Sequence, residues 1–184
     1  GNDIWVVYAI SEQVLHYGGA AFVTSGVQSP EGGFALAPTN TSPTGVITYG
    51  HLLWVVDDAS DTVFMYDVGG AQLGAWLLDP SNGDPSDITL GDRDLWVVDR
   101  ADLVVYRYAD AAALRSGVAH ATGTFALAPL NTAPEGIADP PIQIGDVVND
   151  SIDSVGETDV FTFDYTGGPM FFDAQVGSST TFDW

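Results

Sequence analysis

The chain has 184 residues, of which 25 are acidic and four are basic, giving a formal net charge of −21 at pH 7. A charge of this sign repels phosphate backbones and anionic membrane surfaces, so we expect neither nucleic-acid binding nor attachment to such a surface. Cysteine is absent from the sequence, which excludes disulfides, thiolate catalysis and zinc–thiolate sites.

Three copies of the segment Trp-Val-Val, beginning at Trp5, Trp54 and Trp96, organise the first part of the chain. A tyrosine follows each tryptophan after twelve residues, and each copy continues into an apolar strand and a loop of fixed length. The equivalent strand-and-loop segments are residues 34–45, 76–87 and 125–136. The tryptophans are 49 and 42 residues apart, and such a period in a strand-rich sequence indicates the blades of a β-propeller.

The middle unit predicts four strands separated by clusters of Gly, Asp, Asn and Pro. These strands are Gly45–Tyr49, Leu52–Asp57, Thr62–Asp67 and Ala71–Leu78. The second is apolar on both sides of the pleat, so we expect neighbouring blades to cover both faces. Its apolar run, Leu52–Val56, is far shorter than the ~20 residues of a membrane-spanning helix. We expect an all-β fold with about three four-stranded propeller-like blades, an incomplete propeller, followed by a partial β-sandwich.

The third strand of each unit alternates in character. Aromatic residues recur on one side of this strand, and we expect them to point inward. The residue between them varies, so we expect it to reach solvent; it is His16, Met65 or Arg107. The repeated tryptophans either pack between blades or form a platform on which a sugar stacks, and their valine neighbours favour packing.

Two segments of the repeat resemble a known family. Pro43–Val46 and Pro134–Ala138 look like the turn that opens a blade in NHL-like propellers. Leu53–Asp57 and Leu95–Asp99 look like the second strand and the following turn of that family. The resemblance covers about residues 3–138 and implies a propeller-blade domain over residues 1–138. Closed propellers have about four to eight blades, so either further blades are missing from this chain or a partner completes the arc, and an open arc of about three blades has no closed central channel.

A different module is expected after the repeats. Residues 139–141, Asp-Pro-Pro, interrupt the pattern and predict a short Pro-rich linker. Beyond it, Gly145-Asp146, Ser151-Ile152 and Asp159–Phe163 resemble the start of a bacterial pre-peptidase C-terminal domain, a small β-sandwich appended to secreted proteins. The resemblance implies a partial sandwich over residues 142–184, with an accessory role in secretion, adhesion or substrate binding.

The tail also contains a candidate metal site. Four carboxylates lie within ten residues around a glycine: Asp150, Asp153, Glu157 and Asp159. Calcium prefers oxygen ligands of this kind, although the spacing does not match an EF-hand loop. The sequence therefore offers two interpretations, a calcium site or a solvated acidic loop.

Catalytic motifs are missing from the sequence. We find no Gly-x-Ser-x-Gly elbow, Walker loop or His-Glu-x-x-His helix, and without lysine a Schiff-base mechanism is excluded. His16, His51 and His120 occupy unrelated positions, so we interpret them as surface or turn residues rather than catalytic or metal-binding ones.

Paired acids offer one further route to catalysis. Asp57/Asp58 and Asp92/Asp94 could in principle act as the two carboxylates of a glycosidase, but adjacent strand residues point to opposite faces. Asp57 and its equivalent Asp99 recur at one turn, which favours a role in capping the hairpin. We therefore expect no enzyme active site in this chain.

Three functions remain open from the sequence. The first is a non-catalytic extracellular module that binds, adheres or spaces within a larger secreted bacterial protein, with a protein or glycan ligand. The second is an accessory region of a secreted peptidase or polysaccharide-degrading enzyme whose catalytic residues lie elsewhere. The third is a subunit of an extracellular filament or surface assembly, because exposed blade edges accept strands from other chains.

Overall fold

A computed structural model describes residues 2–138 of the chain. The described residues belong to one compact unit, Gly1–Asp139. The predicted linker at 139–141, the predicted sandwich at 142–184 and the four candidate calcium ligands Asp150, Asp153, Glu157 and Asp159 therefore lie outside the described residues.

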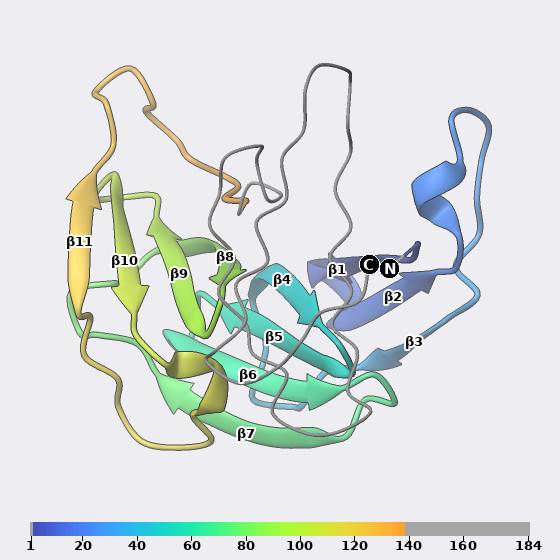
Figure 1. Cartoon of the computed structure of the whole chain (residues 1–184), viewed down its shortest axis with the longest axis horizontal. Coiled ribbons are helices and arrows are strands. Elements are labelled where there is room, and N and C mark those ends of the chain that lie inside the picture. Colours follow the sequence, from blue (N-terminus) through green and yellow to red (C-terminus); the bar gives the residue numbers. More distant parts are fainter. Residues whose placement is uncertain (1, 139–184) are drawn as a thin grey trace, which may run out of the picture. The chain divides into compact units, whose positions relative to one another are not determined.

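The described unit consists of three antiparallel sheets, here called blades 1, 2 and 3, arranged side by side in chain order (Figure 1). Blade 1 contains β1 (Ile4–Tyr8), β2 (Gln13–Tyr17) and β3 (Gly32–Ala35). Blade 2 contains β4 (Pro43–Tyr49), β5 (Leu52–Asp57), β6 (Thr62–Asp67) and β7 (Gln72–Leu77). Blade 3 contains β8 (Pro85–Gly91), β9 (Asp94–Asp99), β10 (Val104–Tyr108) and β11 (Gly123–Ala126). Three short 3-10 helices accompany them: η1 (Ala9–Ser11), η2 (Ala20–Phe22) and η3 (Ala111–Ala113).

The predicted all-β, propeller-like class is confirmed, and β5 and β6 have the bounds that the sequence predicts. One detail differs: blade 1 has three strands within the described residues, because the strand equivalent to β4 and β8 is not among them. Blades 2 and 3 each contain four strands in simple succession, so every neighbour in the sheet is also the neighbour in sequence. Such hairpin connections are short, because they join strands that lie next to each other in the sheet.

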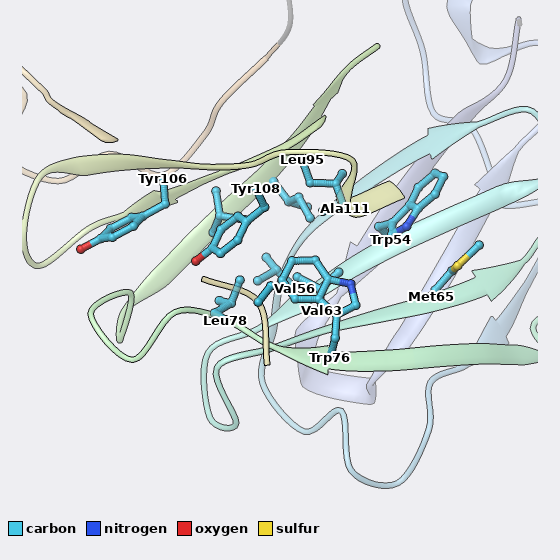
Figure 2. Close-up of a cluster of buried hydrophobic side chains, with 13 residues drawn as sticks. Trp54, Val56, Val63, Met65, Trp76, Leu78, Leu95, Tyr106, Tyr108 and Ala111 are labelled. Atoms are coloured by element: carbon cyan, nitrogen blue, oxygen red, sulfur yellow. The ribbon is translucent and has the colours of Figure 1, made fainter. Parts of the chain in front are cut away.

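The core lies between the faces of adjacent blades. Trp54 and Val56 of β5 face Leu95 and Val97 of β9, in a cluster that Figure 2 shows. Trp5 of β1 packs in the same way on the cluster between blades 1 and 2. Along β5, Leu53–Asp57 are all buried, which confirms that both faces of this strand are covered. Burying an aromatic side chain of this size removes roughly 150–250 Å² from water and dominates the energetics of such an interface.

The prediction that the variable third-strand residue reaches solvent is confirmed for Arg107 and is wrong for Met65. Met65 is completely buried, not exposed, because it lies beside Trp54 on the face that blade 3 covers. The equivalents His16 and Arg107 pair with Trp5 and Trp96 in the same register. The variable position therefore supports the indole of the neighbouring strand: His16 stacks on Trp5 with ring centroids 4.4 Å apart, and Arg107 lies 5.6 Å from the centre of Trp96.

Buried carboxylates join blades 2 and 3 to the loops that precede them. Asp57 is fully buried and accepts hydrogen bonds from the N–H groups of Ser42 at 2.6 Å and Ser60 at 2.9 Å. Ser60 lies in the turn after β5 and Ser42 in the loop before β4, so one side chain fixes both segments. Capping of the hairpin by Asp57 is confirmed, and the link to the interblade loop is additional.

Blade 3 repeats this arrangement. Asp99 accepts N–H bonds from Gly83 at 3.0 Å, Asp84 at 3.1 Å and Asp102 at 2.7 Å. These three charge-assisted hydrogen bonds offset the energetic cost of burying the Asp99 carboxylate, which has almost no contact with solvent. The recurrence of aspartate at the end of the second strand follows from this requirement.

A tyrosine and an asparagine tie each interblade loop to the next blade. The hydroxyl of Tyr108 accepts hydrogen bonds from the N–H of Asp79 at 3.2 Å and from Asn82 Nδ2 at 3.1 Å. The hydroxyl of Tyr66 accepts the same two bonds from Ala37 and Asn40, at 3.1 and 3.3 Å. Burial raises the pKa of Tyr108 to about 12, so this hydroxyl stays neutral.

We predict that Tyr108→Phe destabilises the fold. Removing the hydroxyl leaves two donors in a buried site without an acceptor, at a cost of about 1–3 kcal/mol. Thermal unfolding followed by circular dichroism measures the change, at about 2–4 °C per kcal/mol for a chain of this size. Tyr49→Phe is the matched control, because Tyr49 is 69% exposed. Equal midpoints for the two variants would contradict the proposed role of the hydroxyl.

The inner strands β4 and β8 approach each other closely at Gly45. A Cβ on Gly45 would lie 2.7 Å from the Cα of Asp87 and 2.9 Å from the backbone nitrogen of Ile88. Beside this contact, the hydroxyl of Thr44 donates to the carbonyl of Pro85 at 2.7 Å. Blades 2 and 3 therefore meet through backbone here, and only glycine leaves the necessary space.

Gly45→Ala is expected to lower the free energy of unfolding by roughly 1–3 kcal/mol, the usual cost of overpacking a site that backbone atoms surround. Urea titration of both variants gives the comparison. Gly83→Ala is the control, since nothing lies within 4 Å of the Cβ that it adds. A Gly45→Ala midpoint equal to that of the Gly83→Ala variant would show that β4 and β8 separate easily.

Candidate functional site

The loops between blades and the turns that follow the second strands lie at one end of the sheets. We call this end the loop face; it comprises residues 36–43, 78–85 and 127–134 together with the turns 58–61 and 100–103. Backbone bonds join each turn to an adjacent loop, for example Asp58 N–H to Ser42 O at 3.0 Å and Arg100 N–H to Asp84 O at 2.9 Å. The loop face is therefore a connected surface held by the buried side chains described above.

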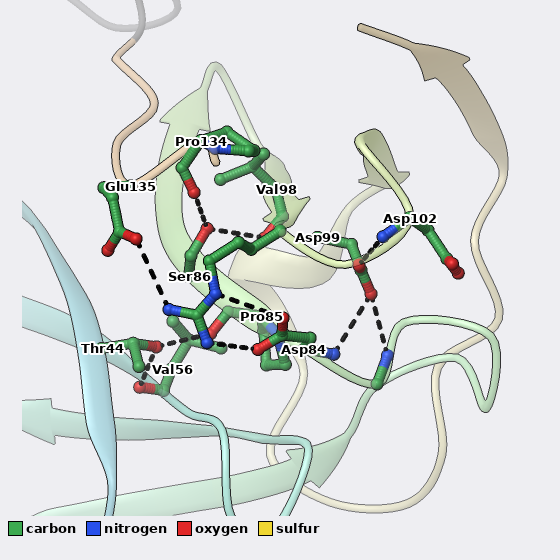
Figure 3. A network of polar contacts seen from close by, with 12 residues as sticks. Thr44, Val56, Asp84, Pro85, Ser86, Val98, Asp99, Asp102, Pro134 and Glu135 are labelled. Atoms are coloured by element: carbon green, nitrogen blue, oxygen red, sulfur yellow. Dashed lines mark hydrogen bonds and ion pairs between the residues drawn. The ribbon is translucent and has the colours of Figure 1, made fainter. Parts of the chain in front are cut away.

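An arginine of the loop face bridges the loop before β8 and the chain that follows β11 (Figure 3). Arg100 donates to both carboxylate oxygens of Asp84, with Nη2–Oδ1 at 2.5 Å and Nε–Oδ2 at 3.2 Å. Its Nη1 lies 3.6 Å from Oε1 of Glu135, which is 70% exposed. A bidentate pair of this kind fixes the guanidinium and orients the loop before β8 relative to the chain after β11.

Two further carboxylates, Asp58 and Asp61, lie in the turn that follows β5. Burial raises the pKa of Asp58 and the negative charge of Asp84 raises it further, while the positive charge of Arg100 acts in the opposite direction. Burial likewise raises the pKa of Asp61, with smaller contributions from Asp99 and Asp57. One oxygen of Asp61 is buried with no hydrogen-bond partner among the described residues. This part of the loop face therefore holds negative charge that would be stabilised by an added cation.

Asp87 on β8 is a third carboxylate with a raised pKa. Burial is the main cause, and the N–H of Ile137, which donates to Oδ2 at 2.8 Å, acts in the opposite direction. The equivalent positions in the repeat are Gly45 and Gly136, both next to the Asp87 carboxylate. The equivalence is visible in the sequence, where glycine, aspartate and glycine end the three fixed-length loops, but nothing there indicated a buried charge.

We predict that Asp87→Asn stabilises the fold at neutral pH. The folded pKa of Asp87 lies above the unfolded value, so the folded state binds more protons between the two values, and stability decreases as pH rises through the folded pKa. Asparagine removes this penalty and keeps an oxygen for Ile137. The difference in melting temperature between variant and wild type should therefore be positive at pH 7 and should shrink as pH falls through the folded pKa.

Asp92→Asn is the control for this change, because it alters the net charge equally at an exposed turn residue. Melting curves between pH 4 and pH 7 provide the measurement. A gain that is the same for both variants would indicate a general charge effect rather than burial of Asp87.

The three histidines remain apart in the fold and contact different partners. His16 Nε2 lies 3.0 Å from Asp3 Oδ2, His120 Nδ1 lies 3.4 Å from Asp79 Oδ2, and His51 is exposed in the turn between β4 and β5. Across residues 2–138, no three His, Asp or Glu side chains are grouped as ligands for a metal ion. In the same part of the chain, no helix is long and apolar enough to cross a membrane.

The repeated tryptophans differ in exposure. Trp54 is buried between blades 2 and 3, and Trp5 packs toward blade 2. Trp96 is partly exposed, with Phe125 at 6.4 Å between ring centroids, because no described blade covers that face of blade 3. Packing between blades therefore accounts for Trp54 and Trp5, and the open face at Trp96 requires a separate explanation.

Comparisons with known proteins found similar solved structures and no family. No protein-family model matches the sequence, and no curated protein matches it. Solved structures with a similar fold include the virginiamycin B lyase from Staphylococcus aureus, at 17% identity and a TM-score of 0.48 over 74% of this chain and 41% of the lyase. The glutaminyl cyclase of Myxococcus xanthus is 10% identical, with a TM-score of 0.49 over 66% of this chain and 49% of the cyclase.

BamB from Moraxella catarrhalis is also similar, at 14% identity and a TM-score of 0.38 over 71% of this chain and 37% of BamB. The chain thus spans less than half the length of each of these proteins.

Proposed function

We propose that the chain is a non-catalytic binding module of a larger secreted bacterial protein, and that its loop face binds a cationic segment of a protein ligand. The observation that carries the proposal is the pair of carboxylates in the turn after β5. Asp58 and Asp61 both have raised pKa values there, and one Asp61 oxygen has no hydrogen-bond partner among the described residues.

A lysine or arginine from a ligand would relieve this unfavourable charge. Long basic side chains reach a carboxylate on flexible stems, so they do not need the ordered set of ligands that a metal ion requires. The overall charge of −21 adds long-range attraction, which accelerates association with a positively charged partner.

The rigidity of the loop face supports a binding role. Four buried side chains hold these loops by hydrogen bonds: Asp57, Asp99, Asn40 and Asn82. A surface that is already ordered loses little conformational entropy when a ligand binds. The exposed side chains on these loops, including Leu130 at 96% exposure, are then free to contact a partner.

The family assignments of the blades and of the tail are also part of this proposal. We assign the blades to the NHL-like type and the tail to the pre-peptidase C-terminal type on the sequence motifs given above. A secreted location agrees with the acidic, cysteine-free composition. A calcium ion bound by Asp150, Asp153, Glu157 and Asp159 would stabilise the tail, and calorimetric titration with calcium, together with the melting temperature, tests that site.

The binding role is tested by titrating the chain with a short oligoarginine peptide, with oligoglutamate as the negative control. We expect the Asp58→Asn/Asp61→Asn variant to bind the basic peptide about fivefold more weakly, since each ion pair at an exposed site contributes about 0.2–1 kcal/mol. Affinity should fall as salt increases.

The matched control is Asp67→Asn/Asp92→Asn, which removes the same charge at the opposite end of the sheets, at the last residue of β6 and in the turn after β8. If both double variants lose the same affinity, the loop face has no special role. The loop-face variant should also melt at a higher temperature at pH 7, because two carboxylates with raised pKa values have been neutralised.

A further inference from the structure

A segment of blade 3 extends the sheet of blade 2. Residues 115–119, here called the clasp, run parallel to β7, and Val118 pairs with Leu77. The N–H groups of Ala75 and Leu77 donate to the carbonyls of Arg115 and Gly117 at 3.0 and 2.9 Å, and Ala119 N–H donates to Leu77 O at 2.9 Å. The clasp therefore satisfies the outer edge of β7 and buries Ala119 against the core between the blades.

Glycine at position 74 makes this contact possible. A Cβ on Gly74 would lie 2.7 Å from the carbonyl oxygen of Arg115 and 2.8 Å from its Cα. The equivalent residues of the other outer strands are Gly32 in β3 and Gly123 in β11, by the register of Phe34, Trp76 and Phe125. At Gly32 nothing lies within 4 Å, and at Gly123 the nearest atom, Arg107 Cβ, is 4.0 Å away.

Blade 1 contains a second clasp with the same conformation. Residues 24–28 follow η2 as residues 115–119 follow η3, at a constant offset of 91 positions. The central glycines have nearly equal φ angles, +94° at Gly26 and +96° at Gly117. The closing bonds also match, with Val23 N–H to Ala20 O and Leu114 N–H to Ala111 O both at 3.0 Å.

This second clasp, here called the free clasp, contacts no outer strand among residues 2–138. Val27, the equivalent of Val118, is 101% exposed, and Phe22 and Val23 beside it are 72% and 48% exposed. Three apolar side chains in water on an ordered segment mark a surface that a partner covers.

The outward faces of blades 1 and 3 are exposed, although the equivalent faces between blades 2 and 3 are buried. Ile4 and Val6 of β1 are equivalent to Leu95 and Val97 of β9, which are fully buried against the Trp54 face of blade 2. Ile4 and Val6 are instead 44% and 42% exposed. At the other end of the described unit, Trp96 and Phe125 expose the face of blade 3 that is equivalent to the Trp54 face of blade 2.

We propose that a second copy of this chain covers these surfaces, with the free clasp of one copy docked in parallel on β11 of the other. The contact between blades 2 and 3 is the template. In the proposed contact between copies, blade 3 of one copy has the role that blade 2 has in the template. Blade 1 of the next copy has the role that blade 3 has in the template. Val27 then pairs with Ala126, as Val118 pairs with Leu77, and Gly123 gives the clasp the space that Gly74 gives within the chain.

Two further groups fit the same arrangement. Asn131 N–H donates to Ala128 O at 2.8 Å, as Asn40 and Asn82 do to Ala37 and Asp79, so the loop after β11 has the conformation that presents asparagine to a tyrosine. Tyr17 of blade 1 is the equivalent of Tyr66 and Tyr108, and it would accept this bond from the second copy. The contact joins different surfaces of the two chains, so it is head-to-tail and produces either a closed ring or a filament.

Sedimentation velocity of the full chain over a range of concentrations tests the proposal. We expect reversible self-association, weakened about tenfold or more by Gly123→Ala, which places a methyl group against the docked clasp. Gly32→Ala is the matched control, because it adds the same methyl group at the equivalent position of β3, which the head-to-tail contact does not use. Val27→Asp should weaken association as Gly123→Ala does.

Both glycine substitutions enter open space, so circular dichroism should show folded monomers for each. A chain that stays monomeric at every concentration overturns the proposal, and this result is expected if further blades of the same polypeptide cover these surfaces. Equal association of the Gly123→Ala and Gly32→Ala variants also overturns it.

Cysteine cross-linking tests the register, because the chain has no cysteine of its own. A Val27→Cys chain mixed with an Ala126→Cys chain should give a mixed dimer with a short bismaleimide reagent. Ala35→Cys, at the equivalent position in β3, should react much less with the Val27→Cys chain. Equal yields from the two mixtures would overturn the assignment of β11 as the docking strand. This outcome is separate from the peptide titration, which concerns the loop face.

Discussion

The buried carboxylate at the end of the second strand is the interaction on which the rest of the structure depends. In blades 2 and 3, Asp57 and Asp99 accept N–H groups from a turn of the blade and from the loop that precedes it. A strand hairpin alone is marginally stable, and its position relative to a neighbour is not fixed by its own ladder. The carboxylate supplies that position, so the flat faces of adjacent blades meet in the register that buries Trp54 against Leu95 and Val97.

The same constraint explains how chemistry is distributed over the molecule. Where a carboxylate is fully supplied with donors, as at Asp99, it is structural. At Asp61, by contrast, one carboxylate oxygen is buried with no hydrogen-bond partner among the described residues, and burial raises the pKa of this group. Within the turn after β5, neighbouring acids therefore differ in the number of N–H groups that they receive, and Asp57 receives two.

The repeat made much of the fold predictable from the sequence, because strand length, turn position and buried aromatics recur together. The bounds of β5 and β6 and the capping role of Asp57 followed from this recurrence. The exposure predicted for Met65 was wrong because the residue type at this position varies between units, and we interpreted that variation as a sign of exposure. The residue at this position in fact packs beside the paired tryptophan, which is buried in blade 2. The pairing of Arg100 with Asp84 and Glu135 and the parallel clasp on β7 join segments that no local pattern relates, so only the structure shows them.

Basic residues are found in only one of the three blades, and this affects the stability of each blade. All four arginines, at 93, 100, 107 and 115, lie in blade 3, where Arg93, Arg100 and Arg107 pair with aspartates. Blades 1 and 2 contain acids but no arginine or lysine, and blade 1 has few fully buried side chains. Local opening at low ionic strength should therefore start in blade 1 and reach blade 3 last, so that the molecule unravels from its amino-terminal sheet.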